Sequence, residues 1–155
     1  MARVETVTDL DLPELLPLIR AYCEFYEVEP THGQLLHMSR ALIEDPANNG
    51  VQFIGRSDEG NPIGFATVVW SWATTSGGRQ GIMHDLFVTP EARGTGIAAK
   101  LIERCTQAAE NHGAVALIWQ TAPDNYRAQR LYDRTGATHS TWLEYAIELD
   151  GKRTS

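Results

Sequence analysis

The pattern of hydrophobic positions along the chain alternates between the period of a helix and the period of a strand. Apolar residues recur every three or four positions, as in amphipathic helices, over residues 12–26, 35–43, 97–109 and 125–132. Alternating or continuous apolar stretches predict strands over residues 2–7, 51–56, 63–72, 79–88, 114–120 and 138–149. The chain is therefore expected to carry four helices and about six strands in a mixed order.

Turn and capping signals support these elements and suggest how they connect. Thr31 followed by Gln34 forms a capping box before the second helix, and Gly113 is a natural stop for the third. A strand, a helix and another strand in succession form a crossover, which makes strands 79–88 and 114–120 parallel. We therefore predict an α/β fold with a mixed, mostly antiparallel sheet around a central parallel pair. Residues 1–150 are expected to form one domain and residues 151–155 a tail.

Length and composition narrow the class of protein. The chain has 155 residues, 43% of them hydrophobic, which suits one domain with its own core. The longest apolar run is too short to cross a membrane, and the acids of the N-terminal segment do not resemble a signal peptide. Two cysteines, Cys23 and Cys105, do not make a disulfide framework. We therefore expect a cytoplasmic protein without a membrane partner.

The net charge of −7 argues against a nucleic-acid partner, because such binding depends on neutralising phosphates. The charge is uneven: five arginines against eleven acids give residues 1–80 a net −6, whereas eight basic residues against nine acids give residues 81–155 a net −1. The first half favours a cationic ligand. The second half offers local positive charge for an anionic ligand, at Arg93, Lys100, Arg127, Arg130 and Arg134.

The most informative stretch joins the strand ending at Val88 to the helix beginning after Gly96. Orphan amides at a helix N-terminus form an anion site, and glycines at 94 and 96 let the backbone approach a phosphate closely. An ordinary glycine turn would look the same. A dinucleotide fingerprint is disfavoured, because no acid follows the next strand, which ends at Gln120.

Two motifs resemble those of a known family. Arg93-x-x-Gly96-x-Ala98 is similar to the acyl-CoA-binding motif of the GNAT superfamily of N-acetyltransferases, and Asn125-x-x-Ala128-x-x-x-Tyr132 matches a second family motif downstream. The order of elements is similar over nearly the whole chain. The resemblance implies transfer of an acetyl group from acetyl-CoA, as cosubstrate, to a primary amine by direct attack in a ternary complex. The rivals are the same fold acting on a protein N-terminus, lysine or amino acid, and a non-catalytic CoA-binding sensor.

The resemblance also implies a set of residues for the CoA chain. Backbone amides after the turn would hold the phosphates, a strand bulge near Phe87 or Val88 would free an amide for the thioester carbonyl, and pantetheine would lie between the two parallel strands. Asn125 would bind CoA, cap its helix, or both. The full set is Leu86, Phe87, Val88, Arg93, Gly94, Thr95, Gly96, Ile97, Ala98, Ala99, Asn125 and Ala128.

The predicted catalytic residues are Tyr132, His84 and Asp85. Tyr132 is the family's usual proton donor to the departing thiolate, although it could simply pack on its helix. The run 82–88 resembles the spermidine/spermine acetyltransferase-like branch, with His84 in place of that branch's glutamate. A histidine accepts protons near neutral pH, and Asp85 could instead hold a cationic substrate. Because neighbours on a strand face opposite sides, we expect only one of the two to face the cleft.

The resemblance implies that the first two helices and the hairpin shape the acceptor side, and in this chain they carry acids and aromatic residues. Acids and aromatic rings together attract an ammonium group, and the predicted substrate-binding residues are Tyr22, Tyr26, Trp70 and Trp119. No group of residues has zinc-ligand spacing, so no metal is expected. The acceptor is therefore predicted to be a small cationic amine. Dimers are common in such families, and a homodimer is compatible with the sequence.

Overall fold

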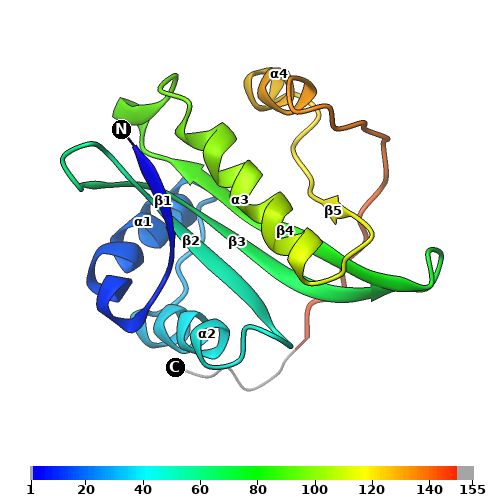
Figure 1. Cartoon of the computed structure of the whole chain (residues 1–155), viewed down its shortest axis with the longest axis horizontal. Coiled ribbons are helices and arrows are strands. Elements are labelled where there is room, and N and C mark those ends of the chain that lie inside the picture. The colour runs from blue at the N-terminus through cyan, green and yellow to red at the C-terminus, as the bar shows by residue number, and fades with distance from the viewer. Residues whose placement is uncertain (1, 150–155) are drawn as a thin grey trace.

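Strands from most of the chain assemble into one sheet in the computed structural model, which describes residues 2–149. Their order across the sheet is the order of the sequence, β1-β2-β3-β4-β5 (Figure 1). The strands are β1 Arg3–Thr6, β2 Gly50–Arg56, β3 Pro62–Ala73, β4 Gly78–Val88 and β5 Leu117–Ile118. Strands β1 to β4 pair antiparallel and β4 pairs parallel with β5, which confirms the predicted mixed α/β fold.

Helices cover both faces of this sheet. The helices are α1 Leu12–Phe25, α2 His32–Glu44, α3 Ile97–Asn111 and α4 Tyr126–Asp133, with short 3₁₀ turns at Asp9–Asp11 and Pro90–Ala92. Helix α3 crosses one face, whereas α1 and α2 lie on the other, and α4 stands beyond β5 (Figure 1). None of the helices among the described residues has the length and apolar character needed to cross a membrane.

Each face of the sheet has its own core, as the alternation of side chains along the strands requires. The core under α1 and α2 includes Ile54 and Phe65, and the core under α3 includes their strand neighbours Phe53 and Ala66. Cys23 is buried in the first core. Cys105 is buried in the second. The sheet is thus covered by helices on both sides, and a ligand can reach it only where strands separate or helices diverge.

The helix starts follow local capping chemistry. At α2, the Gln34 amide donates to Thr31 Oγ1 at 3.1 Å and the Thr31 amide donates to Gln34 Oε1 at 2.8 Å, which confirms the predicted capping box. Asp11 directly precedes α1, but its carboxylate accepts from the Thr8 amide at 2.8 Å instead of capping that helix. Pro17 lies inside α1 without ending it.

The end of the chain departs from the prediction. Residues 138–149 form no strand, and every one of them is exposed. The parallel pair therefore lies at the edge of the described sheet and not at its centre, because nothing pairs with the outer side of β5. The predicted tail, 151–155, lies outside the described residues.

Candidate active site

A bulge in β4 shapes the centre of the candidate site. Asp85 pairs with Thr67 of β3, but the next pair joins Met83 to Val68, so His84 is an extra residue with no partner in that ladder. An extra residue shifts the alternation of side chains by one position. The expectation that only one of His84 and Asp85 could face the cleft is therefore wrong. The bulge also lies three residues earlier on the strand than the predicted position at Phe87.

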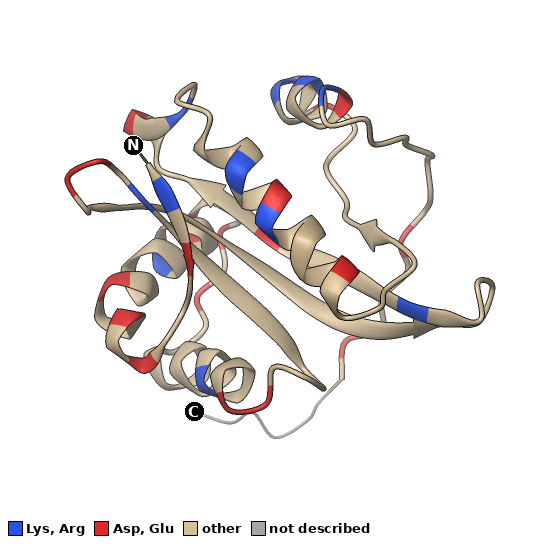
Figure 2. Cartoon of the chain, viewed as in Figure 1, with Lys and Arg blue, Asp and Glu red and all other residues tan. Residues whose placement is uncertain are grey.

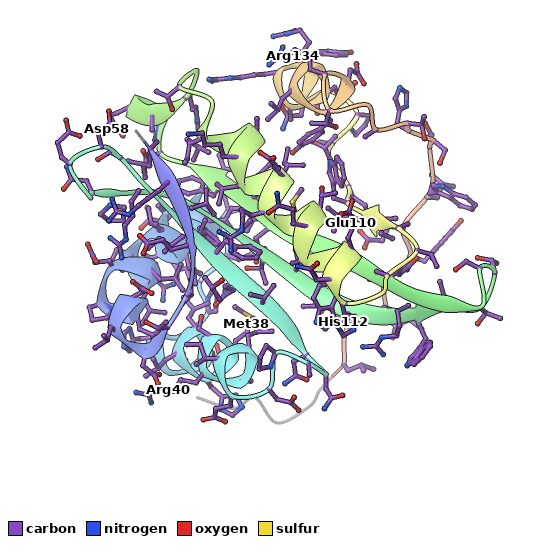
Figure 3. The ribbon with its side chains drawn as sticks, in the orientation of Figure 1. Met38, Arg40, Asp58, Glu110, His112 and Arg134 are labelled. Atoms are coloured by element: carbon purple, nitrogen blue, oxygen red, sulfur yellow. The ribbon has the colours of Figure 1, made fainter. Side chains whose placement is uncertain are left out.

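His84 and Asp85 together line a cavity of about 510 Å³ between α2 and the strands β3 and β4. Most of its surface is apolar, and helix α2 contributes Met38 (Figure 3), together with Ala41 and Leu42. This volume lies within the range of small-molecule sites, roughly 300–1,000 Å³. The remaining lining residues are Asn49, Thr67 and Val69.

A chain of hydrogen bonds supports Asp85 from behind. Gln52 Nε2 donates to Thr67 Oγ1 at 3.1 Å, and both side chains are buried. Thr67 in turn bonds to the Asp85 carboxyl, as does Tyr22. Burial raises the pKa of Asp85 above its ordinary value, and these hydrogen bonds and the charge of His84 oppose the rise. Asp85 is thus an acid held in place within a largely apolar wall.

Tyr22 connects this acid to an aromatic cluster. Its hydroxyl donates to the His84 carbonyl oxygen at 3.3 Å, directly at the bulge. Its ring meets Phe87 edge-on, with centroids 6.1 Å apart, and lies 5.0 Å from the ring of Tyr26. Burial and the neighbouring Asp85 raise the pKa of Tyr22, so the phenol keeps its proton and remains a donor.

Tyr132 approaches the same cluster from α4. Its ring packs edge-on against Trp119, with centroids 5.4 Å apart, and contacts the core under α3. Burial raises the pKa of the Tyr132 phenol, and the nearby Tyr26 adds to the rise. Tyr132 therefore carries a proton at neutral pH and can donate it.

The strands β4 and β5 form a fork. Only two residue pairs join them, Gly81 with Leu117 and Ile82 with Ile118. The rest of β4, including Leu86 and Phe87, has no partner in β5. Beyond Ile82, the peptide groups of β4 that point toward β5 have no hydrogen-bond partner in that strand. They can therefore bond to an extended ligand.

The turn between β4 and α3 has the backbone of an anion site. Gly94 and Gly96 have φ angles of +81° and +89°, which side chains rarely adopt, and the space where a Cβ would stand is open at both. Gly96 precedes α3, and no side chain caps the helix. The first amides of α3, including those of Ala98 and Ala99, therefore stay available to a ligand.

Basic residues surround this turn and the nearby helix α4. Arg93 is exposed and its Nε donates to the Val88 carbonyl at 3.3 Å, which ties it to the end of β4. In Figure 2 the ribbon of α4 is coloured largely as basic residues, and the helix carries Arg127 and Arg130, with Arg134 directly after it. Of the basic residues predicted to hold an anionic ligand, Arg93 thus lies at the turn, whereas Lys100 donates to the Ala2 carbonyl at 2.9 Å.

The other predicted residues lie in three settings. Asn125 caps α4, with its Oδ1 accepting from the Ala128 amide at 3.2 Å. The side chains of Val88 and Ile97 are buried in the core under α3, so only their backbone can face a ligand. Thr95 bonds to the Ala92 carbonyl with its hydroxyl.

Trp70 does not belong to the cavity with His84. It lies on the α3 side, where its ring stacks on His112 at 4.1 Å, and its indole donates to the Pro46 carbonyl at 2.8 Å. His112 is the residue directly after α3, on the face of the sheet opposite to the cavity with His84. Trp70 was predicted to contact the acceptor because it lies on the hairpin, but its position on the strand turns it to the opposite face.

Sequence reasoning missed the residues that support Asp85 and those of α2. Gln52 and Thr67 are polar residues inside apolar strands, and that interruption is a signal that could have found them. The first helices were expected at the acceptor side, but the individual lining residues of α2 could not be identified, because Ala41 and Leu42 look like ordinary core residues. Within residues 2–149, no group of His, Cys, Asp or Glu is arranged to hold a metal ion.

Comparisons with known proteins agree with this fold. The family model described as "Acetyltransferase (GNAT) family" matches residues 15–137. The chain is 29% identical to "Uncharacterized N-acetyltransferase YhfO" of Bacillus subtilis, over 92% of this chain and 94% of that one. It is 27% identical to a thialysine N-epsilon-acetyltransferase of Caenorhabditis elegans, over 96% of this chain and 91% of that one. A solved structure of a probable acetyltransferase has 26% identity and a TM-score of 0.77, over 97% and 99% of the two chains.

The fold and the site define an acyl-CoA-dependent N-acyltransferase. The chain belongs to the GNAT family of acetyltransferases, because the family model covers most of its length. It is therefore an N-acetyltransferase of the acyltransferase class, with acetyl-CoA as its cosubstrate.

Proposed function

We propose that the protein transfers the acetyl group of acetyl-CoA to the primary amine of a small cationic molecule, by direct attack in a ternary complex. The observation that carries this proposal is the bulge, which turns both His84 and Asp85 into one cavity beside the fork of β4 and β5. The proposal includes action in a reducing compartment such as the cytoplasm, where the buried free thiols of Cys23 and Cys105 are stable.

The chain fits acetyl-CoA at the fork and at the anion site. The uncapped start of α3, the open space at Gly94 and Gly96, and Arg93 suit the pyrophosphate. The pantetheine arm would lie along Leu86 and Phe87, bonded to the peptide groups that β5 leaves unpaired. When bound, acetyl-CoA supplies the acetyl group as a thioester and leaves as the thiol.

Two side chains would prepare the amine. An alkylamine is almost wholly protonated at neutral pH and must lose a proton before it attacks. His84 is exposed at the cavity, and its imidazole can accept that proton directly or through water. Asp85, fixed by Thr67 and Tyr22, would attract the cationic group and orient it.

Tyr132 would donate a proton to the thiolate as the carbon–sulfur bond breaks. Its phenol is protonated at neutral pH because burial raises its pKa. Trp119 packs on its ring and would hold it beside the fork. This role is supported by the match of Asn125 to Tyr132 with the family motif and by the cap that Asn125 forms on α4.

The chemistry of the cavity favours a small amine over a protein segment. Its apolar wall from α2 would take a short carbon chain, with Asp85 as the single acid to meet a positive charge. The relative named as a thialysine N-epsilon-acetyltransferase is consistent with an acceptor of this size. The likeness of residues 82–88 to the spermidine/spermine branch supports a cationic acceptor.

The test is release of the CoA thiol from acetyl-CoA with a panel of amines. The panel holds diamines and polyamines, basic amino acids, monoamines without a second charge, aminoglycosides, and peptides with a free N-terminus or lysine. We expect turnover with small cationic amines and little with uncharged-tail monoamines. Faster turnover with peptides would contradict the small-molecule acceptor. Heat protection by CoA without turnover on any amine would instead identify a CoA-binding protein without catalysis.

A further inference from the structure

Three polar side chains lie in one row across the middle of the sheet. Gln52 of β2 pairs directly with Thr67 of β3, and Thr67 pairs directly with Asp85 of β4 (Figure 1). Residues that oppose each other on neighbouring strands place their side chains side by side on one face. That face is the one under α1 and α2, because Phe53, the neighbour of Gln52, belongs to the core under α3. The row therefore leads from the buried interior of the sheet to the cavity.

Gln52 is buried behind the cavity and does not line it. Its exposed fraction is 2%, whereas Thr67 and Asp85 both belong to the cavity wall. Its Nε2 donates to Thr67 Oγ1 at 3.1 Å, but its Oε1 is buried without a hydrogen-bond partner among residues 2–149. A half-satisfied buried amide costs stability that an apolar side chain would not. The amide is therefore better explained by its effect on Thr67 than by packing.

The number of hydrogens on each group fixes the direction of the bonds in this row. A hydroxyl has one hydrogen to donate and accepts with its lone pairs. Because Gln52 donates to Thr67 Oγ1, the single hydrogen of Thr67 is left for the Asp85 carboxylate. Tyr22 also has one hydrogen, but two acceptors compete for it, the His84 carbonyl oxygen at 3.3 Å and the Asp85 carboxylate. Thr67 is thus the donor that Asp85 does not share.

We propose that Gln52 is a positioning residue that acts through Thr67: its amide directs the Thr67 hydroxyl to Asp85 and keeps that carboxyl ionised, so that the cavity selects a cationic acceptor over a neutral one. Without the amide, the hydroxyl can turn its hydrogen away or accept from a protonated Asp85, and the cavity then presents a neutral acid. The use of the charge rests on the proposed function, whereas the state of the carboxyl does not.

The titratable groups around Asp85 stay the same in the variants that test this proposal. His84 lies next to it on β4, and α1 contributes Tyr22 and Cys23. The cavity residues from α2 and β3 do not titrate. A change in the titration of Asp85 between variants therefore reports the hydrogen bond from Thr67.

The first test titrates the Asp85 carboxyl of the free enzyme by carbon-13 NMR, with Asp85→Asn to assign the signal. Without the Thr67 hydrogen, the carboxyl should bind its proton roughly tenfold more tightly, as for loss of one hydrogen bond to a charged group. We expect this change in Gln52→Met and in Thr67→Val, but not in Thr67→Ser, which keeps the hydroxyl. An unchanged titration in Gln52→Met, or equal changes in Thr67→Ser and Thr67→Val, overturns the proposal.

Two further variants separate the hydrogen bond from packing. Ile54→Val is the control, because Ile54 is buried on the same face of β2 two residues away. It should lower the Tm and leave the titration of Asp85 unchanged, and a change as large as that of Gln52→Met overturns the proposal. Gln52→Leu carries the same prediction as Gln52→Met and replaces it if that chain does not fold.

The second test measures selectivity, with diaminobutane as the acceptor that carries a second charge and butylamine as the one that does not. In acid, Gln52→Met should raise the KM for diaminobutane several-fold, with recovery as the pH rises and Asp85 ionises again. The kcat and the KM for acetyl-CoA should not change. An unchanged KM for diaminobutane beside an altered titration overturns the selectivity. Absence of turnover in the natural chain overturns the proposed function instead, and the NMR titration then decides the role of Gln52 by itself.

Discussion

At the scale of single residues, the candidate site depends on an acidic side chain whose burial in the charged form reduces the stability of the fold. Burial raises the pKa of Asp85, which means that folding is less favourable with the carboxylate charged. Hydrogen bonds with Thr67 and Tyr22 stabilise the charged carboxylate and offset part of this cost. Buried acids with a raised pKa are frequent at functional sites, since the group then serves a ligand more than the fold.

Replacing Asp85 tests its role toward the acceptor. Asp85→Asn keeps the size and the hydrogen bonds of the side chain but removes the charge that would attract a cationic amine. We expect the KM for the amine to rise roughly tenfold or more, as for loss of one charged hydrogen bond, with the KM for acetyl-CoA unchanged. Glu59→Gln, at an exposed turn, is the control. An unchanged KM for the amine would remove Asp85 from the acceptor site.

The same substitution predicts a pH-dependent gain in stability. The pKa of Asp85 is higher in the folded chain than in the unfolded chain. Ionisation of Asp85 therefore lowers the stability of the fold as the pH rises through the interval between these two pKa values. Asp85→Asn should therefore have a higher Tm than the natural chain at pH 7. The gain should vanish in acid, below the ordinary carboxyl pKa of about 3.9. Thermal melts over pH 3–8 measure it, and a variant with a lower Tm at pH 7 would contradict the prediction.

Tyr132 is tested by removing one hydroxyl. Tyr132→Phe should lower kcat by about a hundredfold, because general acid catalysis contributes factors of that order. The KM for acetyl-CoA should not change, since the packing against Trp119 remains. Tyr126→Phe, on the exposed side of the same helix, is the control. If the kcat of Tyr132→Phe matched that of the control, the phenol would be a packing residue only.

At the scale of elements, the β4–α3 junction combines a forked strand and an uncapped helix. The strand provides peptide groups that β5 does not pair, and the helix provides orphan amides. Both features belong to the backbone and are compatible with many side chains. Gly94 and Gly96 are the exceptions, because residues other than glycine rarely adopt their positive φ angles. Recognition of the phosphates therefore depends on conformation as much as on charge.

Substitution of Gly96 separates backbone strain from ligand binding. At a φ of +89°, an alanine should cost about 1–2 kcal/mol of stability and also raise the KM for acetyl-CoA by moving the first amides of α3. Gly113→Ala is the matched control, because Gly113 has a φ of +79° with equally open surroundings but follows the other end of α3. It should lose similar stability in urea unfolding with an unchanged KM. Equal KM changes in both variants would assign the effect to strain alone.

At the scale of the whole molecule, one buried arginine at the end of β2 fixes the start of the first helix to the sheet. The Arg56 side chain is 8% exposed, and its guanidinium lies 2.8 Å from Asp11 and 3.0 Å from Glu14. It also donates to the Gly60 carbonyl at 3.1 Å. Since α1 carries Tyr22, this tie helps to hold the aromatic cluster in its place over β4.

Removing this arginine should weaken the fold. Arg56→Met is expected to cost about 1–3 kcal/mol, because it leaves acids and a carbonyl without their donor. Arg3→Met is the control: Arg3 is half exposed and forms an ion pair with the equally exposed Glu5, so its loss should stay within about 0.5 kcal/mol. Urea unfolding measures both, and equal losses would show that the buried network does not stabilise the fold.

The chain by itself determined its elements and most of its chemistry. The helices, the first four strands, the capping box at Thr31 and the glycine turn before α3 follow from patterns within a few neighbouring residues, which local backbone preferences control. The family motifs around Gly96 and Tyr132 are local in the same sense, and for that reason the class of enzyme could be predicted.

Tertiary structure decided which side chains share a cavity and which element is left without a partner. The bulge at His84 exists because β4 must pair with β3, and this pairing turned His84 and Asp85 to the same face. The same strand register places the Trp70 side chain on the opposite face of the sheet, against the core under α3. Residues 138–149 have the alternating pattern of a strand but form none in the described structure. A strand forms only where it can pair with a free edge, and whether an edge is free is a property of the assembled sheet.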